Sequence, residues 1–325
     1  IMIHYWDIIK QAWRITIHNR WLWVMGLFAA MLSNVGQYNS LLSALDGGGW
    51  ARLLNSLSKY WYGGLSLVSF TIHNPLMLIS GLLGLVIIVA LLFFAINSQI
   101  LLVQKIQASI KSEGKKSLPV PKMSFWQQIK TNWPTFWPTA GLIIFVKLVL
   151  FIGLVIVSLS MAGAYLIRQP ITSIFVYIFF ILLFLILIWL VGMWGRYWLF
   201  LFLSDKNSGW VASAKKAWQT LYKNLLPSLE MFIIVILINI LVSLVWIFII
   251  GLLAIPYSLL SLLLIRYLSF SETLLTIVAE ILLIAGFMVV IGIITVLEYS
   301  LWLSFIDKLS NKKIVAKIGH VFHRS

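Results

Sequence analysis

The stretch "KKAWQTLYKNLLP", residues 215–227, decides how this chain is organised, because it is a polar helical pattern between two long apolar segments. Trp218 is followed six residues later by Asn224, and then by an apolar span. Two further copies of this order are found at Trp126–Asn132 and Trp13–Asn19. Three copies at the same place before a span indicate an internal repeat.

The composition predicts an integral membrane protein. The 325 residues are 62% hydrophobic and only 10% charged, whereas a soluble domain carries about 25% charged residues. Apolar runs such as "IFVYIFFILLFLILIWLVGMW" reach the roughly 20 residues that a helix needs to cross a bilayer. The chain has no cysteine, which excludes disulfides, thiolate metal sites and cysteine nucleophiles.

Six membrane spans can be drawn from the apolar segments. They cover about residues 20–36, 75–104, 138–167, 171–204, 227–255 and 272–306. Pro256 is expected to end the fifth span, because proline cannot continue the hydrogen-bond ladder of a helix. Glu230, near the start of that span, is expected to face the cytoplasmic interface.

The distribution of Lys and Arg predicts the orientation. Nineteen of these residues lie in the N-terminus, near residues 105–137 and 196–226, and in the C-terminal tail, against four on the opposite side. Positive charge marks the cytoplasmic side, so both termini are expected in the cytoplasm. The formal charge of +15 is therefore assigned to contact with anionic lipid headgroups rather than with nucleic acid.

The returning spans also repeat. The segment "RYWLFLFLSDK" at 196–206 aligns without gaps on "EYSLWLSFIDK" at 298–308, and "AINSQILLVQK" at 95–105 shares the final Lys. The predicted fold is thus an all-α membrane protein with six transmembrane helices, built as three parallel repeats of an interfacial amphipathic helix plus a helical hairpin. A single polytopic membrane domain is expected over 1–325, with repeats at about 1–106, 120–206 and 208–308 and a basic amphipathic tail at 309–325. A further interfacial helix is expected on the outer face near residues 50–61.

The opening stretch has the pattern of a helix that lies in the headgroup layer. Its apolar positions, three or four residues apart, are Val211, Ala214, Trp218, Leu221 and Leu225. Its other faces carry Lys215, Lys216, Gln219 and Lys223. A tryptophan with lysines beside it is typical of an interface anchor, so Trp13, Trp126 and Trp218 are predicted to lie at one membrane depth.

Polar residues inside the spans are the candidate site, since charges there are costly and tend to be functional or paired. The predicted polar layer consists of Asn97, Lys147, Arg196, Asn239 and Glu298. Arg196 and Glu298 align in the repeat, each roughly 13 Å along its helix from the terminal Asp. A contact from Glu298 to Arg196 or Lys147 is predicted. It would serve either as a structural pair or as part of a solute path.

No catalytic motif accompanies this layer. The five histidines form no HExxH pattern, and there is no Walker or GxSxG motif. We expect neither an enzyme nor a metal or cofactor site from the sequence.

The segment "NRWLWVMGLFAAMLSNVGQYN", which follows an amphipathic helix bearing a Trp, resembles uncharacterised bacterial six-span membrane proteins. The triple pattern of amphipathic helix and hairpin is similar to the membrane domain attached to some glycerophosphodiester phosphodiesterases. Their catalytic domain has no counterpart here, so the resemblance implies a helical membrane domain with an envelope-related role and not the phosphodiester hydrolysis. It also implies location in the bacterial inner membrane.

Two functions remain open from the sequence. The first is a non-enzymatic membrane protein that engages anionic lipids at the cytoplasmic face or a membrane-protein partner. The alternative is a small transporter or channel that uses the polar layer. A solvated path past Lys147 and Glu298 would favour transport, whereas a dry, paired layer would favour the first function.

Overall fold

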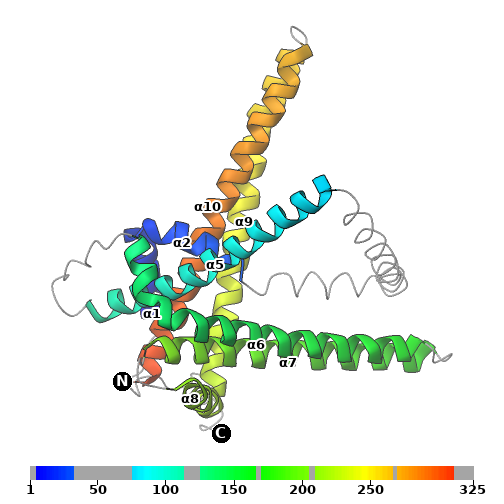
Figure 1. The fold of residues 1–325 in the computed structure, drawn as a ribbon. Coiled ribbons are helices and arrows are strands. Elements are labelled where there is room, and N and C mark those ends of the chain that lie inside the picture. Colours follow the sequence, from blue (N-terminus) through cyan, green and yellow to red (C-terminus); the bar gives the residue numbers. More distant parts are fainter. Residues whose placement is uncertain are drawn as a thin grey trace. The chain divides into compact units, whose positions relative to one another are not determined.

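The computed structural model describes residues 5–32, 75–112, 125–165, 170–204, 209–265 and 269–310. The helices in these ranges are α1 (Tyr5–His18), α2 (Trp21–Ala30), α5 (Pro75–Ser112), α6 (Phe125–Tyr165), α7 (Pro170–Ser204), α8 (Trp210–Lys223), α9 (Leu225–Ile265) and α10 (Ser269–Ser310). Nearly all of the described chain is helical (Figure 1). The predicted all-α class is therefore confirmed.

Among the residues that the structure describes, five helices are long and apolar enough to cross a membrane. Their candidate spans are Ile79–Ser112, Ile129–Val157, Ile178–Ser204, Leu225–Leu259 and Ile277–Leu309. These correspond to the last five predicted spans. For the first, the structure describes residues 20–32, of which the ten residues of α2 form a helix about 15 Å long, shorter than a bilayer. The rest of that segment, the predicted outer helix near 50–61 and the tail beyond Ser310 lie outside the described residues.

The chain forms two compact units. The first contains residues 1–30, 97–139 and 196–325, and the second contains residues 31–96 and 140–195. The boundaries fall at the end of α2 and inside α5, α6 and α7. We describe each unit by itself.

The core of the first unit is made by the carboxyl-terminal ends of α5, α7 and α10. Residues 97–103, 197–200 and 300–306 are buried without interruption. A helical segment that is buried all round lies in the middle of a packed structure. Residues 197–200 and 300–306 belong to the two returning segments that align in the sequence.

Helix α10 is the main packing partner in this unit, since it packs against α1, α2 and α9. Its contact with α2 is made by two glycines. A Cβ atom added to Gly292 would lie 2.3 Å from the backbone oxygen of Trp23, and one added to Gly26 would lie 2.4 Å from the backbone oxygen of Gly292. The two backbones approach this closely only because both positions lack a side chain.

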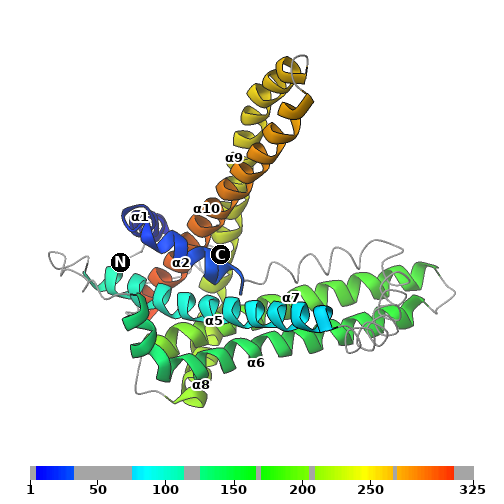
Figure 2. The same ribbon diagram turned by 45° about the horizontal axis from the view of Figure 1, so that its top comes forward.

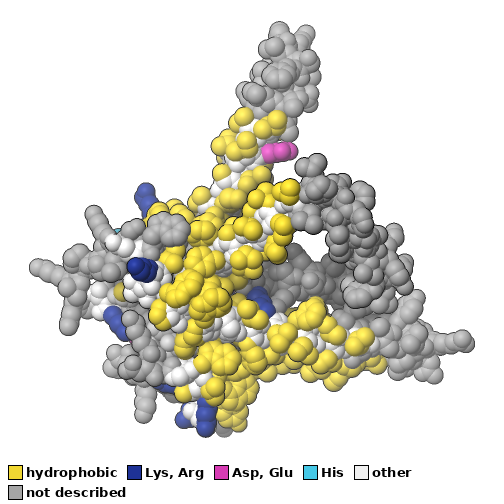
Figure 3. All heavy atoms as spheres, in the orientation of Figure 1, with side chains coloured by type: hydrophobic (Ala, Val, Ile, Leu, Met, Phe, Trp, Pro, Cys, Tyr) yellow, Lys and Arg dark blue, Asp and Glu magenta, His cyan; other side chains and the backbone are white. Residues whose placement is uncertain are grey.

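Helices α9 and α10 lie side by side in both ribbon views (Figures 1 and 2). Beyond the packed core, their apolar side chains are largely exposed, as the hydrophobic surface of this hairpin shows (Figure 3). An apolar helix exposed on most sides is suited to a lipid environment. The predicted end at Pro256 is wrong, because α9 continues through this proline to Ile265. Transmembrane helices tolerate such prolines.

In the second unit, α6 and α7 form a hairpin whose arms run side by side (Figures 1 and 2). Phe145 and Trp194 meet edge to face, with ring centroids 6.3 Å apart. Gly195 lets Val146 approach, since an added Cβ would lie 3.0 Å from its methyl group. Small residues at the contact are typical of packing between membrane helices.

The second repeat differs from the prediction at its start. No break separates an amphipathic helix from the span, because α6 runs from Phe125 through Asn132 to Tyr165 with Pro134 and Pro138 inside it. The predicted separate helix with a junction at Asn132 is therefore wrong for this repeat. Prolines kink a helix without necessarily ending it.

Candidate functional site

Helices α1 and α8 belong to the first unit, and each buries the same side against the rest of that unit. The buried positions are Ile8, Ala12, Ile15 and Thr16 in α1, and Ser213, Ala217 and Leu221 in α8. Ile8, Ala12 and Thr16 are four residues apart, and they coincide with the three buried positions of α8 when Trp13 is aligned with Trp218. Residues four apart share one side of a helix. Both helices are thus attached to the protein through the same side.

A second side of each helix carries an exposed apolar stripe. Trp13 is 51% exposed and Trp218 is 50% exposed. The other exposed positions of the stripe also correspond between the helices, and they are Trp6 and Ile17 in α1, and Val211 and Tyr222 in α8. The predicted apolar face of α8 is therefore divided: Leu221 is buried, whereas Val211 and Trp218 are exposed over half or more of their surface.

A basic sector adjoins each stripe. It consists of the exposed residues Lys10, Arg14 and His18 in α1, and Lys215, Lys216, Gln219 and Lys223 in α8. Lys10 lies over the ring of Trp6, with its Nζ 5.4 Å from the centroid. Asp7 is also exposed here, in the first turn of α1, where a carboxylate interacts favourably with the helix dipole. Each helix thus has three sectors: one on the protein, one apolar and aromatic, and one mainly basic.

The asparagines of the repeat end α1 and α8 in the same way. Asn19 donates from Nδ2 to the carbonyl oxygen of Ile15 at 3.0 Å, and Asn224 does so to Thr220 at 2.9 Å. Each bond adds a side-chain donor to a carbonyl of the last helical turn, where carbonyls lack a full set of partners within the helix; the Thr220 carbonyl also accepts from the backbone N–H of Asn224. The chain then turns into the next helix.

Asn132 takes a different partner. It exchanges two side-chain hydrogen bonds with Gln104 of α5, both at 3.2 Å. Its amide is therefore not used to end a helix, in agreement with the unbroken course of α6. The side chain of Trp126 lies outside the described residues, so the anchor geometry is described for Trp13 and Trp218 alone.

Helix α1 is fixed to the start of α9 by a bond that joins distant parts of the sequence. The hydroxyl of Tyr5 donates to the carboxylate of Glu230, which is buried. Partial burial of Tyr5 raises the pKa of its phenol, and the bond to the Glu230 carboxylate raises it further. The expectation that Glu230 faces the interface is therefore wrong, because its carboxylate is used inside the protein.

The predicted contact between Arg196 and Glu298 is present. Arg196 Nη2 lies 2.6 Å from Glu298 Oε1, and the two side chains are 34% and 22% exposed. The guanidinium of Arg196 also lies over the ring of Trp302, 5.5 Å from its centroid. One end of α7 is thereby attached to α10 by an ion pair and by a cation–π contact.

The tyrosines next to this pair make polar contacts as well. Gln99 of α5 donates to the hydroxyl of Tyr299, and the hydroxyls of Tyr197 and Ser228 lie 2.8 Å apart. These bonds connect α5 to α10 and α7 to α9. The ion pair therefore belongs to a set of polar contacts at the level where four helices of the first unit meet.

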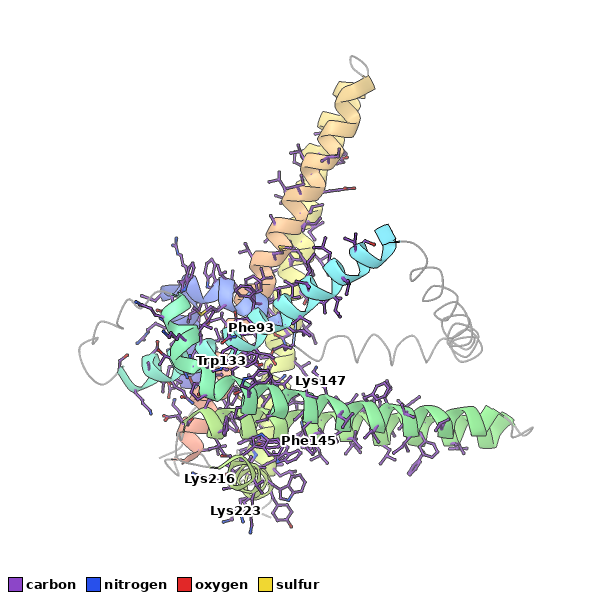
Figure 4. The ribbon with its side chains drawn as sticks, in the orientation of Figure 1. Phe93, Trp133, Phe145, Lys147, Lys216 and Lys223 are labelled. Atoms are coloured by element: carbon purple, nitrogen blue, oxygen red, sulfur yellow. The ribbon has the colours of Figure 1, made fainter. Side chains whose placement is uncertain are left out.

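The other members of the predicted polar layer are distributed over both units. Asn97 is buried in α5 and Asn239 is half-buried in α9, both in the first unit. Lys147 is half-buried in the part of α6 that belongs to the second unit (Figure 4). Of the five predicted residues, the structure brings Arg196 and Glu298 into contact.

Some buried polar atoms of the first unit have no hydrogen-bond partner among the described residues. They are Gln99 Oε1, Ser300 Oγ, Trp302 Nε1 and Ser304 Oγ. Buried polar atoms are normally satisfied, often by internal water. Within the described part of the chain, no group of three His, Asp or Glu side chains could hold a metal ion.

Comparison of the chain with protein-family models, with curated proteins and with solved structures gives no match.

Proposed function

We propose that this protein is a non-enzymatic, multi-pass membrane protein that holds two helices, α1 and α8, on an anionic lipid surface. The observation that carries the proposal is the matching division of both helices into three sectors. Burial of one side against the protein fixes the rotation of each helix. The tryptophan stripe and the basic sector are then presented outward together.

The chemistry of the outward surface favours lipid as the partner. Trp and Tyr side chains prefer the boundary between acyl chains and headgroups, because one end of the ring system is apolar and the other is polar. Lysines near the surface attract anionic lipid by about 1 kcal/mol each. The predicted orientation would place both helices on the cytoplasmic face of a bacterial inner membrane, and the resemblance to envelope membrane domains agrees with this.

The test is the composition of lipid that stays with the purified protein. The protein is reconstituted in bilayers of equal phosphatidylglycerol and phosphatidylcholine with identical acyl chains, and then extracted with a polymer that keeps the adjacent lipid. We expect enrichment of phosphatidylglycerol, decreasing with salt because the Debye length is only about 8 Å at physiological ionic strength.

A pair of matched variants locates the effect. Lys10→Gln with Lys215→Gln removes two charges from the basic sectors, whereas Lys105→Gln with Lys111→Gln removes two from the end of α5. The first variant should lose most of the enrichment and the second should keep at least half of it. Retained lipid of the same composition as the bilayer would refute the proposal.

A transporter is the second candidate, and the unsatisfied buried atoms near the ion pair favour it. Gln99, Ser300 and Ser304 lie on the two helices that carry the Tyr299 contact. Water or a small polar solute would satisfy these atoms. Solute flux into proteoliposomes that is abolished by Ser304→Ala, with unchanged unfolding of the variant, would make transport the better function.

A further inference from the structure

Helix α8 carries a surface depression, which contact with an anionic lipid surface does not by itself require. Trp218, Gln219, Tyr222 and Lys223 line an open depression of about 270 Å³. Two of them, Trp218 and Tyr222, are four residues apart, as are Gln219 and Lys223. The depression therefore lies between an aromatic row and a polar row on adjacent lines of the helix.

We propose that this depression binds the phosphate of one anionic phospholipid headgroup; the inference rests on the proposed function and specifies a site within it. Lys223 and Gln219 supply hydrogen-bond donors from one row, and the Tyr222 hydroxyl supplies another from the opposite row. An ammonium is a common ligand for phosphate. The volume is below the roughly 300–1,000 Å³ of pockets that enclose drug-sized molecules, so it suits a headgroup with the acyl chains outside.

The aromatic row explains why the occupant is a lipid rather than a free phosphate compound. Trp218 and Tyr222 are 50% and 73% exposed, and rings at this boundary pack on the glycerol and upper acyl segments of lipid. A soluble phosphate would leave both rings in water. A lipid covers them while its phosphate contacts the polar row.

The site belongs to α8 and is not repeated in α1. The corresponding positions of α1 are Trp13, Arg14, Ile17 and His18, so neither the phenol nor the lysine ammonium is present at those two places. The repeat supplies two surface helices, and the differences between them make one of the two suited to a defined headgroup.

Lys216 provides a matched control for Lys223. Both are exposed lysines of α8 (Figure 4). They are seven residues apart and therefore lie on the same side, two turns from each other. Only Lys223 lines the depression. A diffuse attraction to the membrane would be weakened equally by the loss of either lysine.

The experiment measures binding of single phosphatidylglycerol molecules to the full chain in detergent by native mass spectrometry. Lys223→Ala should weaken the tightest binding event tenfold or more, as expected for loss of a hydrogen bond from a charged group. Lys216→Ala should weaken it by no more than the fivefold of a nearby surface charge. Lys223→Arg should stay within about threefold of the wild-type chain, since it keeps the charge and the donors.

Two further arms test the identity of the ligand. Phosphatidylcholine should bind at least tenfold more weakly, and glycerol 3-phosphate at millimolar concentration should not displace the bound lipid. Equal losses for Lys223→Ala and Lys216→Ala would overturn the site while leaving the enrichment of anionic lipid intact. Displacement by glycerol 3-phosphate would overturn the assignment to lipid, and the absence of any phosphatidylglycerol preference would overturn both proposals.

Discussion

Replacing Glu298 by Gln tests how much the ion pair to Arg196 stabilises the first unit. Breaking a buried pair costs about 3–5 kcal/mol, and an exposed pair contributes only about 0.2–1 kcal/mol. The Arg196 and Glu298 side chains are 34% and 22% exposed at an N–O distance of 2.6 Å. Glu298→Gln should therefore cost about 2 kcal/mol, between the two limits.

Arg196→Gln should cost more than Glu298→Gln, because it also removes the cation–π contact with Trp302, worth about 0.5–1 kcal/mol or more. The loss of stability in the double variant should be smaller than the sum of the two single losses by about 1–2 kcal/mol, since neither charge is left without its partner. The assay is unfolding in detergent followed by circular dichroism, analysed as a double-mutant cycle.

Glu280→Gln is the matched control for this cycle. Glu280 is an exposed carboxylate on the same helix, α10, and its replacement should change the stability by less than about 0.5 kcal/mol. Strictly additive losses for Arg196 and Glu298 would show that the pair contributes nothing, and the account of how α7 is attached to α10 would then be incorrect.

Three further predictions follow from the packing and the charge pattern. Gly292→Ala should lower the stability by about 1–3 kcal/mol, because the added methyl group meets the backbone of α2, whereas Gly251→Ala, with open space around it, should be neutral or slightly stabilising in thermal unfolding. Asn224→Ala should cost about 1 kcal/mol through loss of the bond that ends α8; an unchanged midpoint in the same assay would argue against that role. Reporter fusions after residue 115 should be active in the cytoplasm and those after residue 168 outside it, and the reverse result would exclude the predicted orientation.

The parts of the structure that the sequence could predict are those with a repeated signal. The segments 196–206 and 298–308 align in the sequence, and the structure buries residues 197–200 and 300–306 within them. The charges at corresponding depths predicted a contact of Glu298 with Arg196 or Lys147, and the structure shows the one with Arg196. Unpaired charge is too costly in such segments for both residues to remain isolated.

Other features of the structure depend on contacts that no periodic pattern in the sequence indicates. Apolar periodicity could not tell the exposed apolar side of α8 from the buried side, because Leu221 and Trp218 are both apolar and the buried side includes the small residues Ser213 and Ala217. The bond from Tyr5 to Glu230 joins residues 225 positions apart.

Asn132 shows that a position in the repeat does not by itself predict the hydrogen bond that its residue makes. It occupies the same place in the repeat as Asn19 and Asn224, but its hydrogen bonds go to Gln104 on another helix. The identity of a residue within a repeat predicts its capacity to form a hydrogen bond. The neighbouring helix decides which bond is made.

The absence of cysteine from the chain allows a direct test of the central claim, that α1 and α8 present equivalent apolar stripes to the membrane. Single cysteines at Ile17 and Tyr222 carry a spin label in the stripes, and single cysteines at Arg14 and Gln219 carry it in the adjoining polar sectors. The depth of each label is measured in anionic bilayers from its relative accessibility to oxygen and to a water-soluble nickel complex. The account predicts that the two stripe labels lie at the same depth, about 5–10 Å into the headgroup and acyl boundary, with both polar-sector labels shallower, in the hydrated headgroup layer where the nickel complex reaches them. Stripe labels that are as accessible to nickel as the polar-sector labels, or that lie at clearly different depths, would contradict it.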